Sequence, residues 1–125
     1  MTTWKAVERA IAKVLRGTRI PVSGRQRGDS ADIEHPFFSV EVKHRETLPD
    51  WILDALDQAK KSKRGSRIPL AVLHGKGMKY EESLAFMELR DIMAMYDRIE
   101  KLEEKLSVAV EYITTEMEGN NGNKN

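Results

Sequence analysis

The sequence contains no cysteine, so neither a disulfide nor a thiolate zinc site can hold the fold together. Long hydrophobic runs are also missing, since no stretch approaches the roughly 18 apolar residues of a membrane-spanning helix. The start, Met1-Thr-Thr-Trp-Lys, lacks the apolar segment of a signal peptide. We therefore expect a soluble, cytoplasmic protein that does not contact a membrane.

The chain does contain enough hydrophobic residues for one modest core, and its charge is unevenly distributed. At 125 residues, a hydrophobic content of 40% suffices for a single domain with an extension. Residues 1–67 hold 14 Lys and Arg against 9 Asp and Glu, whereas residues 68–125 hold 7 against 11. A net charge of +5 on the first part suits binding to a polyanion, although chance segregation of charge explains it equally well.

Hydrophobic spacing predicts an α/β fold. Three amphipathic helices are expected, over residues 3–16, 50–63 and 91–118. Five short strands are expected, over residues 19–22, 31–34, 38–43, 68–74 and 83–89, with the fourth buried at the centre of the sheet. The expected architecture is a central mixed sheet of about five strands flanked by helices.

The third helix carries a heptad pattern, which suggests a boundary between two parts of the chain. Ile92, Ile99, Leu106 and Ile113 recur every seven residues, and Met95, Leu102 and Ala109 follow them by three. Residues 1–90 are thus expected to form the core domain, 91–118 a long helix and 119–125 a disordered polar tail. Two interpretations stay open for the helix, namely pairing in a homodimer and packing on its own domain.

Acidic and basic side chains alternate in the third expected strand. There, Glu41 and Lys43 project from one face, about 7 Å apart along the chain. A turn at His35-Pro36 could bring Asp32 beside Glu41. Two carboxylates so placed would bind Mg²⁺ or Mn²⁺, and Lys43 could position water or neutralise phosphate charge. Taken alone, the pattern is also typical of a solvated strand face.

The order of motifs resembles the Holliday-junction resolvases of archaea and their phage-encoded relatives, within the PD-(D/E)XK nuclease superfamily. The resemblance covers about residues 3–90. It rests on four motifs in sequence order: Glu8-Arg9 in the first helix, Ser23-Gly24-Arg25 in a loop, Asp32-Ile33 and Glu41-Val42-Lys43.

This resemblance implies a restriction-endonuclease-like core and a metal-dependent active site. Glu8, Asp32, Glu41 and the Val42 carbonyl would surround Mg²⁺, for which Mn²⁺ can substitute, and Lys43 would be catalytic. Ser23 matches a loop serine that the family uses near the scissile phosphate. The chain departs from the family at Ala31, where many members have proline, and in its long helix.

Each of these residues also has a structural interpretation. Glu8 could pair with Lys5 or Lys13 on the surface of its helix. Asp29 is the rival of Asp32 and fits a turn. Gln58 is a weak further candidate for the site. The two tryptophans, Trp4 and Trp51, are expected to be anchors in the core or at its edge rather than platforms for bases.

The candidate DNA contacts are basic side chains, which grip phosphates rather than read bases. They are Arg9, Arg25, Arg27, His44, Arg45, Lys60 and Lys61. The expected function is cleavage of four-way DNA junctions by a homodimer, without a small-molecule cofactor. Two alternatives remain, namely a phage nuclease of the same superfamily acting on other DNA, and a non-catalytic dimeric DNA-binding protein.

Overall fold

A computed structural model of the chain describes residues 3–21 and 31–122, and it divides the protein into two compact units. The N-terminal unit comprises residues 1–88 and the C-terminal unit residues 89–125. In the N-terminal unit, α1 (Trp4–Leu15) precedes β1 (Thr18–Arg19) and β2 (Ile33–Glu34), and α2 (Asp50–Ser62) precedes β3 (Ala71–Leu73), a 3₁₀ turn (Tyr80–Glu82) and β4 (Leu84–Phe86). The C-terminal unit is a single helix, α3 (Leu89–Gly122).

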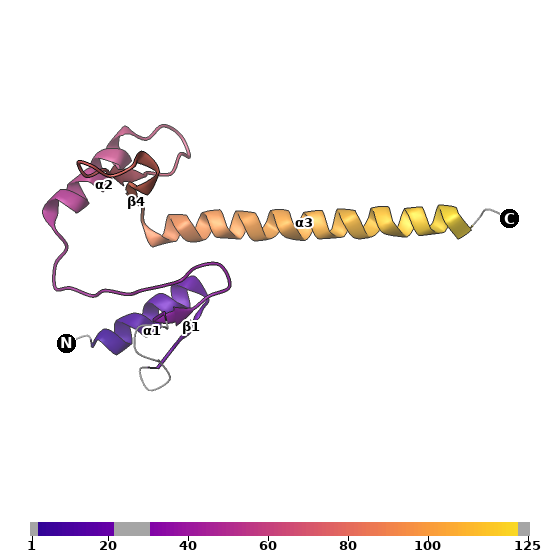
Figure 1. Cartoon of the computed structure of the whole chain (residues 1–125), viewed down its shortest axis with the longest axis horizontal. Helices are drawn as coiled ribbons and strands as arrows, with labels where there is room; N and C mark the ends of the chain where they lie inside the picture. Colours follow the sequence, from indigo (N-terminus) through magenta and orange to yellow (C-terminus); the bar gives the residue numbers. More distant parts are fainter. Residues whose placement is uncertain (1–2, 22–30, 123–125) are drawn as a thin grey trace. The chain divides into compact units, whose positions relative to one another are not determined.

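Helix α1 has well-defined ends that the sequence accounts for. The Thr3 side chain accepts a hydrogen bond from the Ala6 amide at 3.2 Å, which caps the first turn. Arg16 adopts a left-handed conformation with φ of 56°, and the Gly17 amide donates to the Ala12 carbonyl at 2.9 Å. The helix therefore stops sharply, and the chain turns into β1, against which α1 packs (Figure 1).

Strand β2 is the centre of the small structure that holds the candidate site. It pairs antiparallel with β1, with Arg19 opposite Ile33, and Ile33 also forms a bridge to Val40. The chain returns from β2 through a bend at Pro36, where the His35 ring nitrogen Nδ1 accepts hydrogen bonds from the Phe37 and Phe38 amides. The turn expected at His35-Pro36 is thus present.

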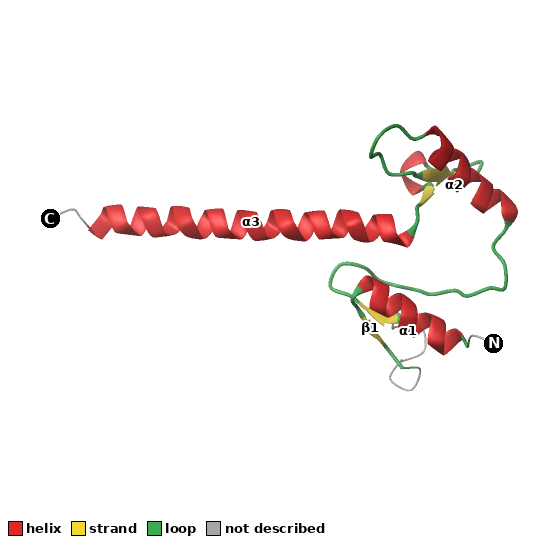
Figure 2. Ribbon diagram, turned by 180° about the vertical axis from the view of Figure 1, so that it is seen from behind, coloured by secondary structure: helices red, strands yellow, loops and turns green. Residues whose placement is uncertain are grey.

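The second half of the N-terminal unit consists of helix α2 and the two-stranded sheet formed by β3 and β4. Strands β3 and β4 pair antiparallel, with Val72 opposite Ala85, and α2 packs against β3 (Figure 2). Ala71 is buried, but Val72 remains 60% exposed. A strand that is paired on one edge and uncovered on one face does not bury its whole apolar run.

The expected fold is therefore wrong. In place of one central sheet of about five strands, the described residues form two separate two-stranded antiparallel sheets, and the chain is mostly helical. Each ladder contains only two or three residue pairs, and residues 38–43 contribute one bridge instead of a strand. Four of the five expected strand segments overlap a strand of the structure, and the remaining one, residues 38–43, does not. Hydrophobic alternation also does not specify which segments pair.

Trp4 and Trp51 remain 48% and 59% exposed, so neither lies in the core, and of the two expected positions only the one at its edge is compatible with this exposure. The buried hydrophobic residues of the N-terminal unit are small or aliphatic: Ala12, Leu15, Ile33 and Ala71.

Helix α3 is continuous over 34 residues, which corresponds to a length of about 51 Å. It begins at Leu89 and runs to Gly122, beyond the expected end at residue 118, and residues 123–125 lie outside the described part of the chain. No helix among the described residues combines the length and the apolar character needed to cross a bilayer.

A methyl group at Gly17 should loosen the contact between the end of α1 and β2. A Cβ atom there would lie 2.6 Å from the Glu34 carbonyl oxygen and 2.8 Å from the Ile33 side chain. We expect Gly17→Ala to lower the free energy of unfolding by about 1–3 kcal/mol, as measured by urea denaturation followed by tryptophan fluorescence. Gly119→Ala is the matched control, because no atom lies within 4 Å of its added Cβ. Equal stability of the two variants would contradict the packing described.

Candidate active site

One pocket of about 400 Å³ gathers residues from three separate segments of the N-terminal unit. From α1 come Trp4 and Glu8, from the start of β2 comes Asp32, and from the segment after the hairpin come Glu41, Val42, Lys43 and His44. These segments are brought together by the packing of α1 on β1 and by the bridge between Ile33 and Val40. Four of the seven lining residues are side chains that the sequence motifs predict for a metal-dependent active site: Glu8, Asp32, Glu41 and Lys43.

Asp32 is the most firmly positioned of these side chains. Its backbone carbonyl accepts a hydrogen bond from the Ile20 amide, and its amide donates to the Val40 carbonyl, both at 2.9 Å. Its carboxylate oxygen Oδ2 accepts a hydrogen bond from the Val42 amide at 2.6 Å. The residue is only 5% exposed. Asp32 therefore joins the strand to the segment that carries Glu41 and Lys43.

Glu8 is buried in the face of α1 that also carries Ala12 and Leu15, and it is 5% exposed. Its Oε2 atom accepts a hydrogen bond from Nε of Arg19 at 2.7 Å, and both side chains are largely shielded from water. The surface pairing with Lys5 or Lys13 is therefore not its arrangement. A carboxylate removed from water needs such a partner, because an unpaired buried charge is strongly unfavourable.

Glu41 and Lys43 are exposed members of the pocket, as are Trp4 and His44. From Phe38 to Lys43 the side chains alternate between half-buried and exposed, so Glu41 and Lys43 share one side although no regular strand forms. The Nζ atom of Lys43 lies 3.4 Å from Oε1 of Glu41, with the side chains 77% and 59% exposed. An ion pair this exposed contributes little to stability. Lys43 is consequently able to leave Glu41 for an incoming phosphate at small cost.

The donor set is compatible with Mg²⁺ in chemistry but does not form a closed cage. Among the residues that the structure describes, no group of three or more His, Cys, Asp or Glu side chains lies close enough together to hold a metal ion. Magnesium requires fewer protein ligands than this, because it keeps several waters and is often bound by one or two carboxylates together with substrate phosphates. Glu8 and Asp32, two buried carboxylates on one pocket, satisfy that requirement.

Comparison with family models, with characterised proteins and with solved structures finds no match to this chain. The site is therefore interpreted from its own geometry.

The remaining candidates fall into three groups. Ser23, Arg25, Arg27 and the rival Asp29 lie outside the described residues. Arg9, His44 and Arg45 are exposed, and His44 lines the pocket. Gln58 is exposed on α2, and it is not among the residues that line this pocket.

The two lysines of α2 have carboxylate partners within their own unit. Lys60 pairs with Glu88, and Lys61 pairs with Asp57 one turn earlier at 2.8 Å. The hydrogen bond and the charge of Lys61 lower the pKa of the Asp57 carboxyl, and the same interactions raise the pKa of Lys61. DNA phosphates would have to compete with these carboxylates for either lysine.

Sequence reasoning missed two residues of this site. The sequence pattern indicates only a strand start at Arg19, although its guanidinium holds Glu8 and also lies 5.6 Å from the centre of the Trp4 ring. For Trp4 the pattern predicts an anchor in the core or at its edge, and it gives no sign that this residue borders the pocket. Neither assignment has a local sequence signal, because both depend on how α1 crosses β1.

Replacing Arg19 tests whether Glu8 is held as a buried partner. Arg19→Met keeps the aliphatic stem but leaves the Glu8 carboxylate without its guanidinium, so we expect stability to fall by about 3 kcal/mol in urea denaturation. Adding Glu8→Gln to Arg19→Met removes the carboxylate that has lost this guanidinium and should restore part of the loss. Strictly additive effects of the two substitutions would argue against the pair.

Proposed function

We propose that this protein is a metal-dependent endodeoxyribonuclease that hydrolyses phosphodiesters in branched DNA, with four-way junctions as its substrate. The observation that carries the proposal is the shared pocket, in which Glu8, Asp32, Glu41 and Lys43 meet from segments up to 35 positions apart. Buried carboxylates beside an accessible lysine are the residue types that metal-assisted phosphodiester hydrolysis requires. The order of motifs that resembles the junction resolvases supports the same activity.

Each side chain has a distinct part in this chemistry. When bound, Mg²⁺ supplies charge that polarises the phosphodiester and favours ionisation of a water. Asp32 and Glu8 hold it, with Asp32 fixed by the Val42 amide and Glu8 by Arg19. Lys43 donates hydrogen bonds from Nζ to the attacking water or to a phosphate oxygen, and Glu41 keeps that ammonium at the mouth of the pocket.

The proposed substrate follows from charge and from the family resemblance together. Residues 1–67 carry a net charge of +5, which suits the sugar-phosphate backbone. The exposed basic side chains Arg9, His44 and Arg45 belong to the same part of the chain as the pocket and would contact phosphates without reading bases. Such an enzyme would act in the cytoplasm, in a host cell if a phage encodes it.

Two other functions would use some of the same features of the N-terminal unit. A nuclease of the same superfamily that acts on ends, flaps or nicked duplex would need the same pocket. A non-catalytic DNA-binding protein would need the basic residues but not the buried carboxylates. The presence of two carboxylates with 5% exposure favours an enzyme, since DNA binding alone gains nothing from buried negative charge.

Active-site substitutions should abolish cleavage. We expect Asp32→Asn and Lys43→Met each to slow cutting of a labelled four-way junction in Mg²⁺ by at least about a hundredfold. The control is Glu34→Gln, which removes an exposed carboxylate two residues from Asp32, outside the pocket, and should leave the rate unchanged. Retention of cutting by Asp32→Asn would exclude this active site.

Substrate choice separates the proposed nuclease from its nearest alternative. The protein is expected to cut a synthetic four-way junction in preference to linear duplex of the same sequence, with symmetric nicks mapped on opposing strands. Equal cleavage of both substrates would remove the junction-specific part of the proposal while leaving the nuclease intact. Binding of junctions with no cleavage in Mg²⁺ or Mn²⁺ would instead favour the non-catalytic DNA-binding protein.

A further inference from the structure

Helix α3 exposes a long apolar seam whose spacing is that of a coiled coil. Ile92, Ile99, Leu106 and Ile113 occupy the first position of successive heptads, and Met95, Leu102 and Ala109 occupy the fourth. In the structure Leu102 is 59% exposed, Leu106 65% and Ile113 56%. Large apolar side chains repeated at this spacing are normally covered by another helix.

The charges beside the seam select both the partner and its orientation. In a parallel, in-register pair, the seventh position of one heptad faces the fifth position of the next heptad on the other helix. Arg98 then faces Glu103 of the second copy, and symmetry makes this pair twice. An antiparallel pair would bring seventh positions together instead, and within the seam that set (Arg98, Lys105 and Tyr112) offers neither cation a carboxylate. In the described part of the chain, neither Arg98 nor Glu103 has an ion-pair partner of its own.

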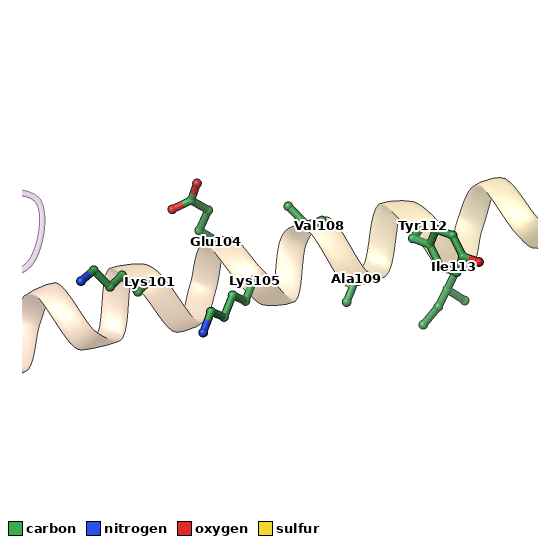
Figure 3. A pocket seen from close by; sticks show the side chains of 7 residues that line it. All are labelled: Lys101, Glu104, Lys105, Val108, Ala109, Tyr112 and Ile113. Carbon is green, nitrogen blue, oxygen red and sulfur yellow. The ribbon is translucent and has the colours of Figure 1, made fainter.

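The same register brings together a further seventh and fifth position within the seam. Lys105 would lay its aliphatic stem on Val110 of the second copy. In Figure 3, Lys105, Ala109 and Ile113 project to one side of the helix, and Glu104 and Val108 project to the other. A shallow groove runs along the helix from Lys101 to Ile113, with the small Ala109 between larger neighbours.

The choice of aliphatic residues favours two strands. Isoleucine occupies three of the four first positions, and β-branched residues there favour a parallel dimer. Glu116 takes the next fourth position, where a parallel pair would place two carboxylates against each other. The seam therefore ends at Ile113, and the last turns of α3 lie beyond it.

We propose that α3 binds α3 of a second copy of this chain, forming a parallel, in-register, two-stranded coiled coil from Ile92 to Ile113. Both copies of residues 1–88 are then attached at the same end of the coiled coil. This inference does not depend on the proposed nuclease activity. If that activity is correct, one dimer carries two cleavage sites, as symmetric cutting of a four-way junction requires.

Site-specific cross-linking tests the orientation on the full-length protein, because the chain has no cysteine of its own. Ala109→Cys places a thiol at a fourth position within the seam, where a parallel, in-register pair brings the two copies of this residue together. Ser107→Cys places one on the outer face as the control. With mild oxidant at micromolar concentration, we expect most Ala109→Cys chains to become covalent dimers and Ser107→Cys chains to stay uncrosslinked.

Analytical ultracentrifugation of the unmodified protein completes this test. A sedimenting dimer together with the Ala109→Cys cross-link supports the proposal. A monomer at micromolar concentration, as expected if α3 packs on its own chain, overturns it. A dimer in which Ala109→Cys fails to cross-link overturns it as well, because the copies then run antiparallel or meet elsewhere. A trimer or tetramer contradicts the two-stranded assignment.

A charge swap provides an independent readout of the register. Arg98→Glu and Glu103→Arg should each weaken dimerisation on the order of tenfold, since each replaces two attractions by two repulsions. The double variant restores opposite charges and should recover most of the affinity. Affinities that are unchanged by the single substitutions, or not recovered by the double one, would show that Arg98 does not face Glu103. None of these measurements involves DNA cleavage, so their outcome is separate from that of the nuclease proposal.

Discussion

The hydrogen bond from the Val42 amide to the Asp32 carboxylate is the contact on which the candidate site depends. The segment after the hairpin has only one bridge to β2, so backbone pairing alone does little to hold it. A side-chain acceptor at Asp32 supplies the missing attachment and at the same time aims that carboxylate into the pocket. Because a hydrogen bond to an ionised acceptor is stronger than one between neutral groups, this single contact orders both Asp32 and the Glu41–Lys43 segment.

The small interior of the N-terminal unit contains charged as well as hydrophobic side chains. Its buried hydrophobic side chains are Ala12, Leu15, Ile33 and Ala71, and its buried carboxylates are Glu8 and Asp32. Replacing buried ionic groups by apolar ones is often neutral or stabilising in other proteins, so burial of this kind is poor evidence for a stabilising role. Chemistry in the pocket explains it better, since carboxylates shielded from water interact more strongly with a cation and a phosphate.

The two units differ in the interactions they offer. The N-terminal unit has a basic sequence and a polar pocket, whereas α3 has an apolar seam bordered by residues of both signs. Under the two proposals, such a division would separate binding of a polyanion from association of identical chains, because attraction to phosphate weakens with salt while burial of an apolar seam does not. It also accounts for the uneven charge that the overall value of +1 conceals.

The sequence by itself located the helices and six of the seven residues that line the pocket, and the tertiary structure decided the sheets and the partners. Capping residues and helical spacing located α1 and α2 within one or two residues, and alternation placed Glu41 and Lys43 on one side, because these are local properties of the backbone. The single five-stranded sheet was wrong because strand pairing depends on contacts far apart in sequence, which no local pattern encodes. The ion pair of Arg19 with Glu8 was missed for the same reason, since only the packing of α1 on β1 makes it possible.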